Sequence, residues 1–300
     1  MSGTIGEQVA WAKASALVVA APERCVLEVT GADRLSWLNA LLTCDLQSRK
    51  EGDAVQGLAL AQKGKIVSDV VVLVRADRAL VVVERATVDA LTASFERHLM
   101  MEDAEVHRSD RDVWFVHGPR AREVLAAAQS EQAAGGVLDL TGFGGAVLAT
   151  ADASRTEGEL ARAARDAGGG VGDAAGWEAV RLLAGVPRFG VDFDESTYPQ
   201  EAALESRAVS FGKGCYLGQD VVCMLDMRGR VNRRLVSLSL DTDAVPAPGA
   251  AITDDSGATV GQLTSAARVG DEVRGLAMVK HACVAKGTVV RVEGRPARVV

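Results

Sequence analysis

The spacing of hydrophobic residues predicts alternating helices and strands over the first two-thirds of the chain. "ADRLSWLNALLT", residues 32–43, places its leucines on one helical face, and residues 86–100, 157–166 and 174–185 also show helical spacing. Residues 55–84 read as three strands divided by "QKGK" and "RADR", which is typical of an antiparallel meander. Because strands arrive in clusters between helices, the predicted fold class is α+β and not a doubly wound parallel sheet.

The pattern changes after Arg234, where short apolar runs alternate with "PAPG", "DDSG" and "VGDE". Short strands separated by regular turn signals predict a small closed or half-closed β-barrel. We therefore place a domain boundary near Asn232, with an α+β region over 1–231 and a barrel domain over 232–300. Between Gly185 and Gly212 the chain is irregular and punctuated by proline, and ordered loops of this length are often functional.

Composition narrows the classes of partner. At 300 residues with 48% hydrophobic content, the chain can form two or three cores. A net charge of −7 argues against a surface built for nucleic acid or anionic membranes, so neither is an expected partner. The five cysteines contain no C-x-x-C pair, which favours a reducing compartment, and we predict the cytoplasm. The four histidines stand at no ligand spacing from a cysteine, so no metal site is predicted.

The clearest candidate chemistry lies in "KGCYLGQD", Lys213 to Asp220. A helix is expected to begin at Gly218, which places Cys215 just ahead of a helix N-terminus. The helix dipole and the nearby cation of Lys213 would favour a thiolate and lower the thiol pKa. Gly214 and Gly218 permit positive φ or the close approach of a ligand. The alternative is that Cys215 is a small buried hydrophobic residue, which is the usual fate of a free cysteine.

A basic run, "RGRVNRR", follows the thiol segment and carries Arg228, Arg230 and Arg234. In an acidic protein these side chains are suited to bind phosphate or a carboxylate-rich ligand. The alternative is a solvated entry into the first barrel strand. The closeness of the run to Cys215 favours a functional interpretation.

These segments resemble the YgfZ family of folate-binding proteins. The resemblance is carried by residues 177–222, which include "KGCYLGQD", and by the following "RGRVNRRLV"; it continues weakly upstream and downstream to cover nearly all of the chain. The family is related to the glycine cleavage T-protein, an aminomethyltransferase, and to the mitochondrial iron–sulfur maturation factor. The resemblance implies a ring of subdomains with mixed or antiparallel sheets and helices, plus the C-terminal barrel.

The resemblance also implies a function: a tetrahydrofolate-binding accessory protein that supports the assembly or repair of iron–sulfur enzymes, including tRNA-modifying enzymes. Its partners would be iron–sulfur client or assembly proteins, and a transient iron–sulfur cluster would be shared with a partner. Cys215, Lys213 and Asp69 are the implied catalytic residues, with Cys215 facing a cavity sized for a pterin. The implied folate-binding residues are Gly214, Tyr216, Gly218, Gln219, Asp220, Arg181, Arg228, Arg230 and Arg234.

Two departures from the T-protein pattern bear on this expectation. In "GKIVSDVV", Ser68 replaces one acid of a pair and only Asp69 remains. In the helix written R-L-E-A-G in T-proteins, Leu183 replaces the acid. The alternative function is therefore a true folate-dependent aminomethyl or one-carbon transferase, in which Asp69 would be the charged group near the reacting nitrogen.

Overall fold

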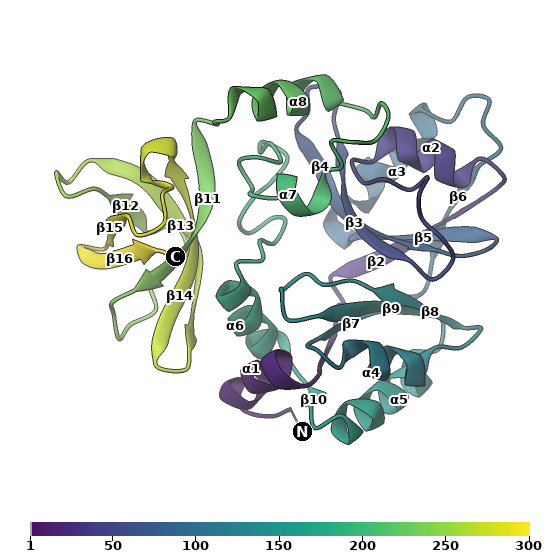
Figure 1. Ribbon diagram of the computed structural model, residues 1–300, viewed down its shortest axis with the longest axis horizontal. Helices are drawn as coiled ribbons and strands as arrows, with labels where there is room; N and C mark the ends of the chain where they lie inside the picture. The colour runs from purple at the N-terminus through teal and green to yellow at the C-terminus, as the bar shows by residue number, and fades with distance from the viewer. Residues whose placement is uncertain (1) are drawn as a thin grey trace.

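The computed structural model describes residues 2–300 and contains two packed sheets with their helices and a separate barrel (Figure 1). One five-stranded sheet has the order β10-β1-β7-β9-β8. Its strands are β1 (Leu17–Ala20), β7 (Asp112–His117), β8 (Ala133–Val137), β9 (Gly145–Thr150) and β10 (Gly170–Val171). The helices α4 (Ala121–Ala128) and α5 (Ala153–Asp166) contribute to the same core as this sheet.

The second five-stranded sheet has the order β3-β4-β5-β2-β6. Its strands are β2 (Arg24–Thr30), β3 (Ala54–Leu60), β4 (Ile66–Val74), β5 (Arg78–Glu84) and β6 (Glu105–Ser109). The antiparallel pairs β3–β4 and β4–β5 form the predicted meander. The helices α2 (Arg34–Leu41) and α3 (Val88–Arg97) cover one face, because α3 presents Val88, Leu91 and Phe95 at helical spacing to the core.

The two sheets pack face to face. Val26, Val82 and Phe115 belong to a shared apolar core between them, whereas the alternate positions Val81 and Val83 face the helices. This alternation follows from the two-residue period of a strand, which sends successive side chains to opposite faces. The result is a layered body with helices on both outer surfaces and an intersheet core inside.

The C-terminal strands close into a six-stranded barrel with the order β11-β14-β13-β12-β15-β16. The strands are β11 (Arg233–Leu240), β12 (Ala251–Thr253), β13 (Thr259–Val269), β14 (Glu272–Lys280), β15 (Val289–Val292) and β16 (Arg295–Val299). The first barrel strand starts one residue after the predicted boundary at Asn232. The predicted α+β fold class with a C-terminal barrel is confirmed.

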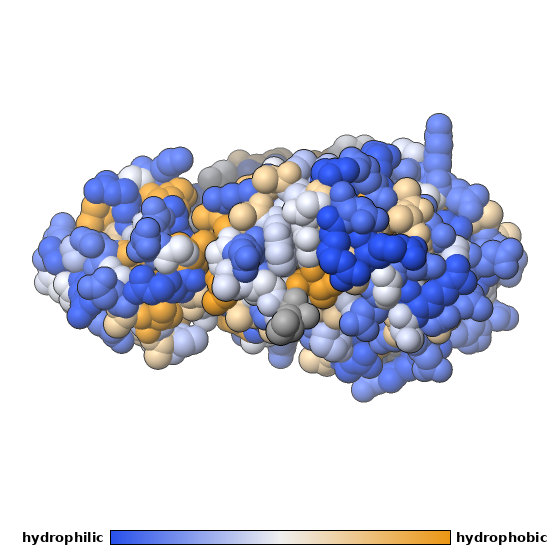
Figure 2. All heavy atoms as spheres, turned by 90° about the horizontal axis from the view of Figure 1, so that it is seen from below, coloured by the Kyte–Doolittle hydropathy of each residue, from blue (hydrophilic) through white to orange (hydrophobic). Residues whose placement is uncertain are grey.

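Helix α6 (Ala174–Ala184) joins the body to the barrel. Leu182 packs with Leu235 and Leu276 of the barrel, while Val180 packs with residues of α1 (Ile5–Ala14) and β1. After α6 the chain runs irregularly through the short helix α7 (Glu205–Ala208) to α8 (Gln219–Arg228), which leads into β11 (Figure 1). On the face shown in Figure 2, hydrophobic residues gather toward the barrel and the centre, and hydrophilic residues cover most of the opposite end.

Within residues 2–300, no helix has the length and apolar character needed to cross a lipid bilayer.

Candidate functional site

A narrow central cavity lies where the intersheet core meets α6. Its walls come from both sheets and from α6, and it offers about 40 Å³ of free space to water-sized molecules. That space is enough for a few waters and too small for a pterin ring, so side chains must move to admit a larger ligand. Asp69 and Arg181, both predicted site residues, line this cavity.

Three charged side chains form a row across neighbouring strands at the cavity. Arg24 Nη2 lies 2.8 Å from Asp69 Oδ2 and 3.1 Å from Glu84 Oε1. The row follows from the register, because Arg24 pairs with Glu84 and the pairing of Val70 with Val83 puts Asp69 beside Glu84. Asp69 Oδ1 and Arg24 Nη1 are buried and have no hydrogen-bond partner among the described residues. A ligand with donors and acceptors would satisfy them.

The two carboxylates compete for one guanidinium. Burial raises the pKa of Glu84 to about 7; Arg24 opposes this rise and Asp69 adds to it. The pKa of Arg24 is itself raised, since its two acidic neighbours outweigh its burial. Glu84 therefore exchanges a proton near neutral pH inside the cavity, which makes it a candidate proton donor or acceptor.

We expect Glu84→Gln to change how stability depends on pH. The folded protein holds the Glu84 proton more tightly than the unfolded chain does. The stabilisation that results from binding this proton is complete below pH 4.5 and is lost as the pH rises through about 7. Its full size is about 3 kcal/mol. Burial lowers the pKa of His117 to about 4, so the contribution of His117 to stability increases as the pH rises. This opposes the contribution of Glu84, and the stability of wild type alone would therefore vary less with pH.

The measurement is the difference in free energy of unfolding between wild type and Glu84→Gln, from urea denaturation at several pH values. This difference should fall by about 2–3 kcal/mol from pH 4.5 to pH 8. The exposed Gln47 provides the control, because Gln47→Asn adds and removes no titratable group and should give a difference that is constant with pH. A constant difference for Glu84→Gln would contradict the expectation.

The serine that replaces an acid in the T-protein pattern points away from the cavity. Ser68 is fully buried, and its hydroxyl lies 2.7 Å from Thr87 Oγ1. Because neighbours on a strand face opposite sides, Asp69 lies on the intersheet side and Ser68 on the helix side. The Leu183 departure also lies elsewhere, since Leu183 does not line the central cavity. Ser68 and Leu183 both lie outside the central cavity, so neither departure removes a carboxylate from its wall.

A stack of aromatic rings forms another wall of the cavity. The His117 ring lies 4.3 Å from the Trp177 ring with 6° between their planes, and Phe115 continues the stack at 6.0 Å and 8°. Both ring nitrogens of His117 are buried without a hydrogen-bond partner. A flat stack beside unpaired polar atoms suits a planar heteroaromatic ring.

Arg181 serves mainly as an internal tie. It is fully buried, with Nε and Nη2 bonded to Glu178 and Nη1 bonded to Asp192 at 2.8 Å and to the Val186 carbonyl. Asp192 in turn accepts hydrogen bonds from Thr264 and Ser265 of the barrel. These bonds occupy most of the five guanidinium donors. The role of Arg181 seen in the structure is therefore to link α6 to the barrel through Asp192.

Cys215 is exposed and does not line the central cavity. The expectation that it faces a cavity sized for a pterin is therefore corrected, as is the alternative that it is a small buried residue. The cause is the course of the chain, which holds the thiol segment against the end of α2: the Leu217 amide donates to the Ala40 carbonyl, and the Ser210 amide donates to the Thr43 carbonyl.

Lys213 also takes a different place from the one expected. Its Nζ donates to the carbonyls of Asn39, Leu42 and Cys44 at 2.6–2.7 Å. An ammonium has three donors, so none remains for Cys215. Burial lowers the pKa of Lys213 to about 8. Lys213 therefore does not stabilise a thiolate at Cys215, as the sequence suggested. Instead it caps the last carbonyls of α2, where a cation is stabilising.

The rest of the motif holds the loop in place. Gly218 has a φ of +80°, and a Cβ there would lie 2.6 Å from the Ala61 carbonyl oxygen, so its close approach is to the β3–β4 turn. Tyr216 packs in an apolar cluster beside the irregular segment, and burial raises its pKa. Helix α8 begins as predicted, with Gly218 as N-cap. Gly214, Gln219 and Asp220 do not line the central cavity.

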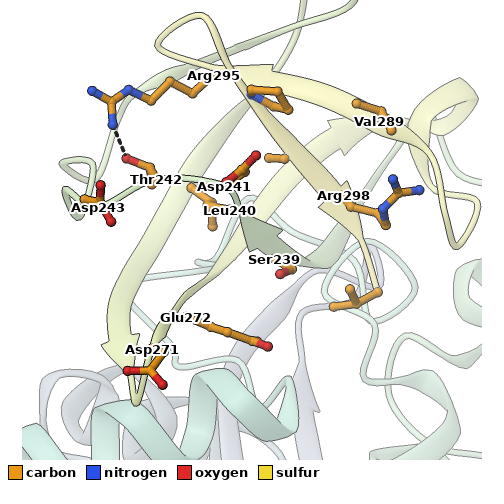
Figure 3. Close-up of a pocket in the computed structure, with 13 residues that line it drawn as sticks. Ser239, Leu240, Asp241, Thr242, Asp243, Asp271, Glu272, Val289, Arg295 and Arg298 are labelled. Carbon is orange, nitrogen blue, oxygen red and sulfur yellow. Dashed lines mark hydrogen bonds between the residues drawn. The ribbon is translucent and has the colours of Figure 1, made fainter.

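The basic run lies at a second cavity. Arg230 and Arg234 line a space of about 280 Å³ between α8 and the barrel, and none of its lining residues lines the central cavity. Arg228 is exposed in the last turn of α8 and lines neither. A third, larger hollow of about 700 Å³ lies on the barrel (Figure 3). There Arg295 donates to Thr242 Oγ1, and no predicted site residue takes part.

The structure thus brings Asp69 together with Arg24, Glu84, His117 and Trp177, which sequence reasoning missed. A signal existed for Glu84, which ends the apolar run "ALVVVE", because a charge at the end of a buried strand needs a partner. No comparable signal marks His117 or Trp177, which have only helix and strand spacing. Among residues 2–300, no group of three or more His, Cys, Asp and Glu side chains could hold a metal ion.

Comparison with known proteins places these features in a family. Residues 2–141 match the GCVT N-terminal domain family, and residues 232–300 match the CAF17 C-terminal beta-barrel domain family. The tRNA-modifying protein YgfZ of Vibrio vulnificus (strain CMCP6) is 26% identical over 234 residues, covering 76% of this chain and 71% of that protein. The chain belongs to the YgfZ/CAF17 family.

Other relatives of this YgfZ/CAF17 family member are aminomethyltransferases. That of Thermotoga petrophila is 28% identical over 265 residues, covering 79% of this chain and 70% of that protein. The solved glycine cleavage system aminomethyltransferase T from Bartonella henselae superimposes with a TM-score of 0.84 at 22% identity, covering 98% of this chain and 88% of that one. This likeness shows the fold, so the predicted T-protein-like architecture is confirmed. The predicted family is confirmed by the two domain families and the YgfZ relatives.

Proposed function

We propose that this protein is a tetrahydrofolate-binding accessory factor of the cytoplasm that supports the assembly or repair of iron–sulfur enzymes, including enzymes that modify tRNA. The observation that carries the folate part is the central cavity, with its unpaired charged atoms beside a flat aromatic stack. The YgfZ relatives support the tRNA part, because their name describes a tRNA-modifying protein.

The residues of the central cavity carry polar atoms and an aromatic surface that suit a pterin once side chains move to admit it. The ring presents N–H donors to carboxylates and acceptor atoms to a guanidinium, which matches the unpaired atoms of Asp69 and Arg24. Glu84 adds a group that exchanges a proton near pH 7, and Trp177 with His117 offers a stacking surface. When bound, the folate supplies a carrier of one-carbon units. The protein residues hold and orient it and control a proton at Glu84.

The thiol is assigned to a partner protein and not to the folate. Cys215 lies on an exposed loop that Lys213 and Leu217 fix on either side, so a partner can approach the sulfur without any opening of the core. A transient iron–sulfur cluster at this place would take its other ligands from the iron–sulfur client or assembly protein. Arg228, exposed in the last turn of the following helix α8, is suited to an acidic surface of such a partner.

The test is an anaerobic titration of the purified protein with tetrahydrofolate, in which binding is measured by calorimetry. Asp69→Asn removes a charged acceptor and should weaken binding by about 10- to 100-fold. Asp220→Asn, in the exposed first turn of α8, is the matched control and should bind like wild type. Equal binding by Asp69→Asn would contradict the assignment of the cavity. Turnover of an aminomethylated donor by wild type would instead support the transferase alternative.

A further inference from the structure

The second cavity, between α8 and the barrel, has the features of a separate small-ligand site. It measures about 280 Å³ and is formed by the segment around α7, the end of α8 and the barrel turn after β14. Since it shares no lining residue with the central cavity, its ligand is distinct from the folate of the proposed function. The chemistry of its walls indicates the class of that ligand.

One wall carries two acceptors without donors. Gln200 is 95% buried, with only 5% of its surface exposed; its Nε2 donates to the Val222 carbonyl and its Oε1 is unpaired. Glu205 Oε1 accepts from Arg234 at 2.6 Å, while Oε2 is buried and unpaired. An unpaired buried acceptor costs about 1–3 kcal/mol. A ligand with several N–H donors, such as an ammonium, would satisfy these oxygens once the side chains of the wall move to expose them.

The same cavity also contains a free cation. Among residues 2–300, Arg230 forms no hydrogen bond or ion pair, and it lines the cavity. The lining has equal numbers of fixed charges, with Glu205 and Asp226 against Arg230 and Arg234. A ligand without net charge preserves this balance, so an ammonium and a carboxylate on the same molecule are favoured over an anion or a cation alone.

The remaining wall is apolar and formed by Leu225, Val231 and Val284. We propose that the cavity binds a free α-amino acid with an aliphatic side chain. Its ammonium lies toward Gln200 Oε1 and Glu205 Oε2, its carboxylate toward Arg230, and its side chain toward the apolar wall. Bidentate arginine–carboxylate pairing supplies the orientation.

The experiment is calorimetric titration of the full-length protein with L-leucine, N-acetyl-L-leucine and L-leucinamide. Leucine should bind, and both blocked analogues should bind at least tenfold more weakly, since each lacks one of the two charges. Arg230→Gln should weaken leucine binding at least tenfold. Arg122→Gln is the matched control, because Arg122 is exposed on α4 and does not line the cavity; it should bind leucine like wild type.

Three results would overturn the proposal. No binding of leucine at millimolar concentration would remove the site. Equal binding of all three compounds would show that the charged ends are not recognised. Equal effects of Arg230→Gln and Arg122→Gln would place the ligand elsewhere. Folate binding is tested separately by Asp69→Asn, so failure here leaves the proposed function untouched.

Discussion

Replacement of Cys215 by alanine is expected to abolish the support of a [4Fe–4S] enzyme in a host that lacks its own family member. The sulfur is exposed and fills no core, so the folded protein should keep its stability within about 0.5 kcal/mol. The loss of activity should be at least tenfold, because alanine has no sulfur that could contact a partner's cluster or thiol. The measurements are the activity of the enzyme and the methylthiolation of tRNA in the complemented host.

Cys223 provides the matched control for this experiment. It lies on the following helix α8 and is half-buried, so Cys223→Ala changes a thiol in the same region without touching the anchored loop. Cys223→Ala should rescue like wild type. Rescue by Cys215→Ala equal to that of wild type would remove the thiol from the proposed function, and a large loss of stability in Cys215→Ala would show that it has a packing role.

The local elements could be predicted because each rests on short-range patterning. The apolar run of β4 and the i, i+3, i+7 spacing of α3 specify strand and helix by periodicity alone. The start of α8 at Gly218 follows from its positive φ, which only glycine adopts easily. The barrel could also be predicted from the sequence, since its turns carry glycine and proline at short intervals.

The composition of the site could not be predicted to the same degree, because it depends on strand register and on the approach of distant segments. The row of Arg24, Glu84 and Asp69 exists only when three strands pair in one register. Lys213 and Cys215 are two residues apart, yet the lysine is half-buried against α2 and the thiol is exposed. Sequence proximity suggested a shared role for the two, whereas the fold gives them separate ones.

Replacement of Arg24 by methionine is expected to cause the largest loss of stability in the body of the protein. The guanidinium is buried between Asp69 and Glu84, and its removal leaves two buried carboxylates without a counter-charge. Breaking such a buried arrangement typically costs about 3–5 kcal/mol. The free energy of unfolding from urea denaturation at pH 7.5 measures this loss.

The pH dependence of the loss separates charge from packing. Without Arg24, the cause that most lowers the pKa of Glu84 disappears, and the Glu84 carboxyl can be protonated in mildly acidic solution. The cost of Arg24→Met should therefore shrink toward pH 4.5, and it should shrink at pH 7.5 when Asp69→Asn and Glu84→Gln are added. Arg78→Met is the control, since the Arg78–Glu28 pair is partly exposed and is worth at most about 1 kcal/mol. An equal cost for Arg24→Met and Arg78→Met would show that the charged row contributes little to the fold, and the cavity would then lose the electrostatic character on which its assignment to folate depends.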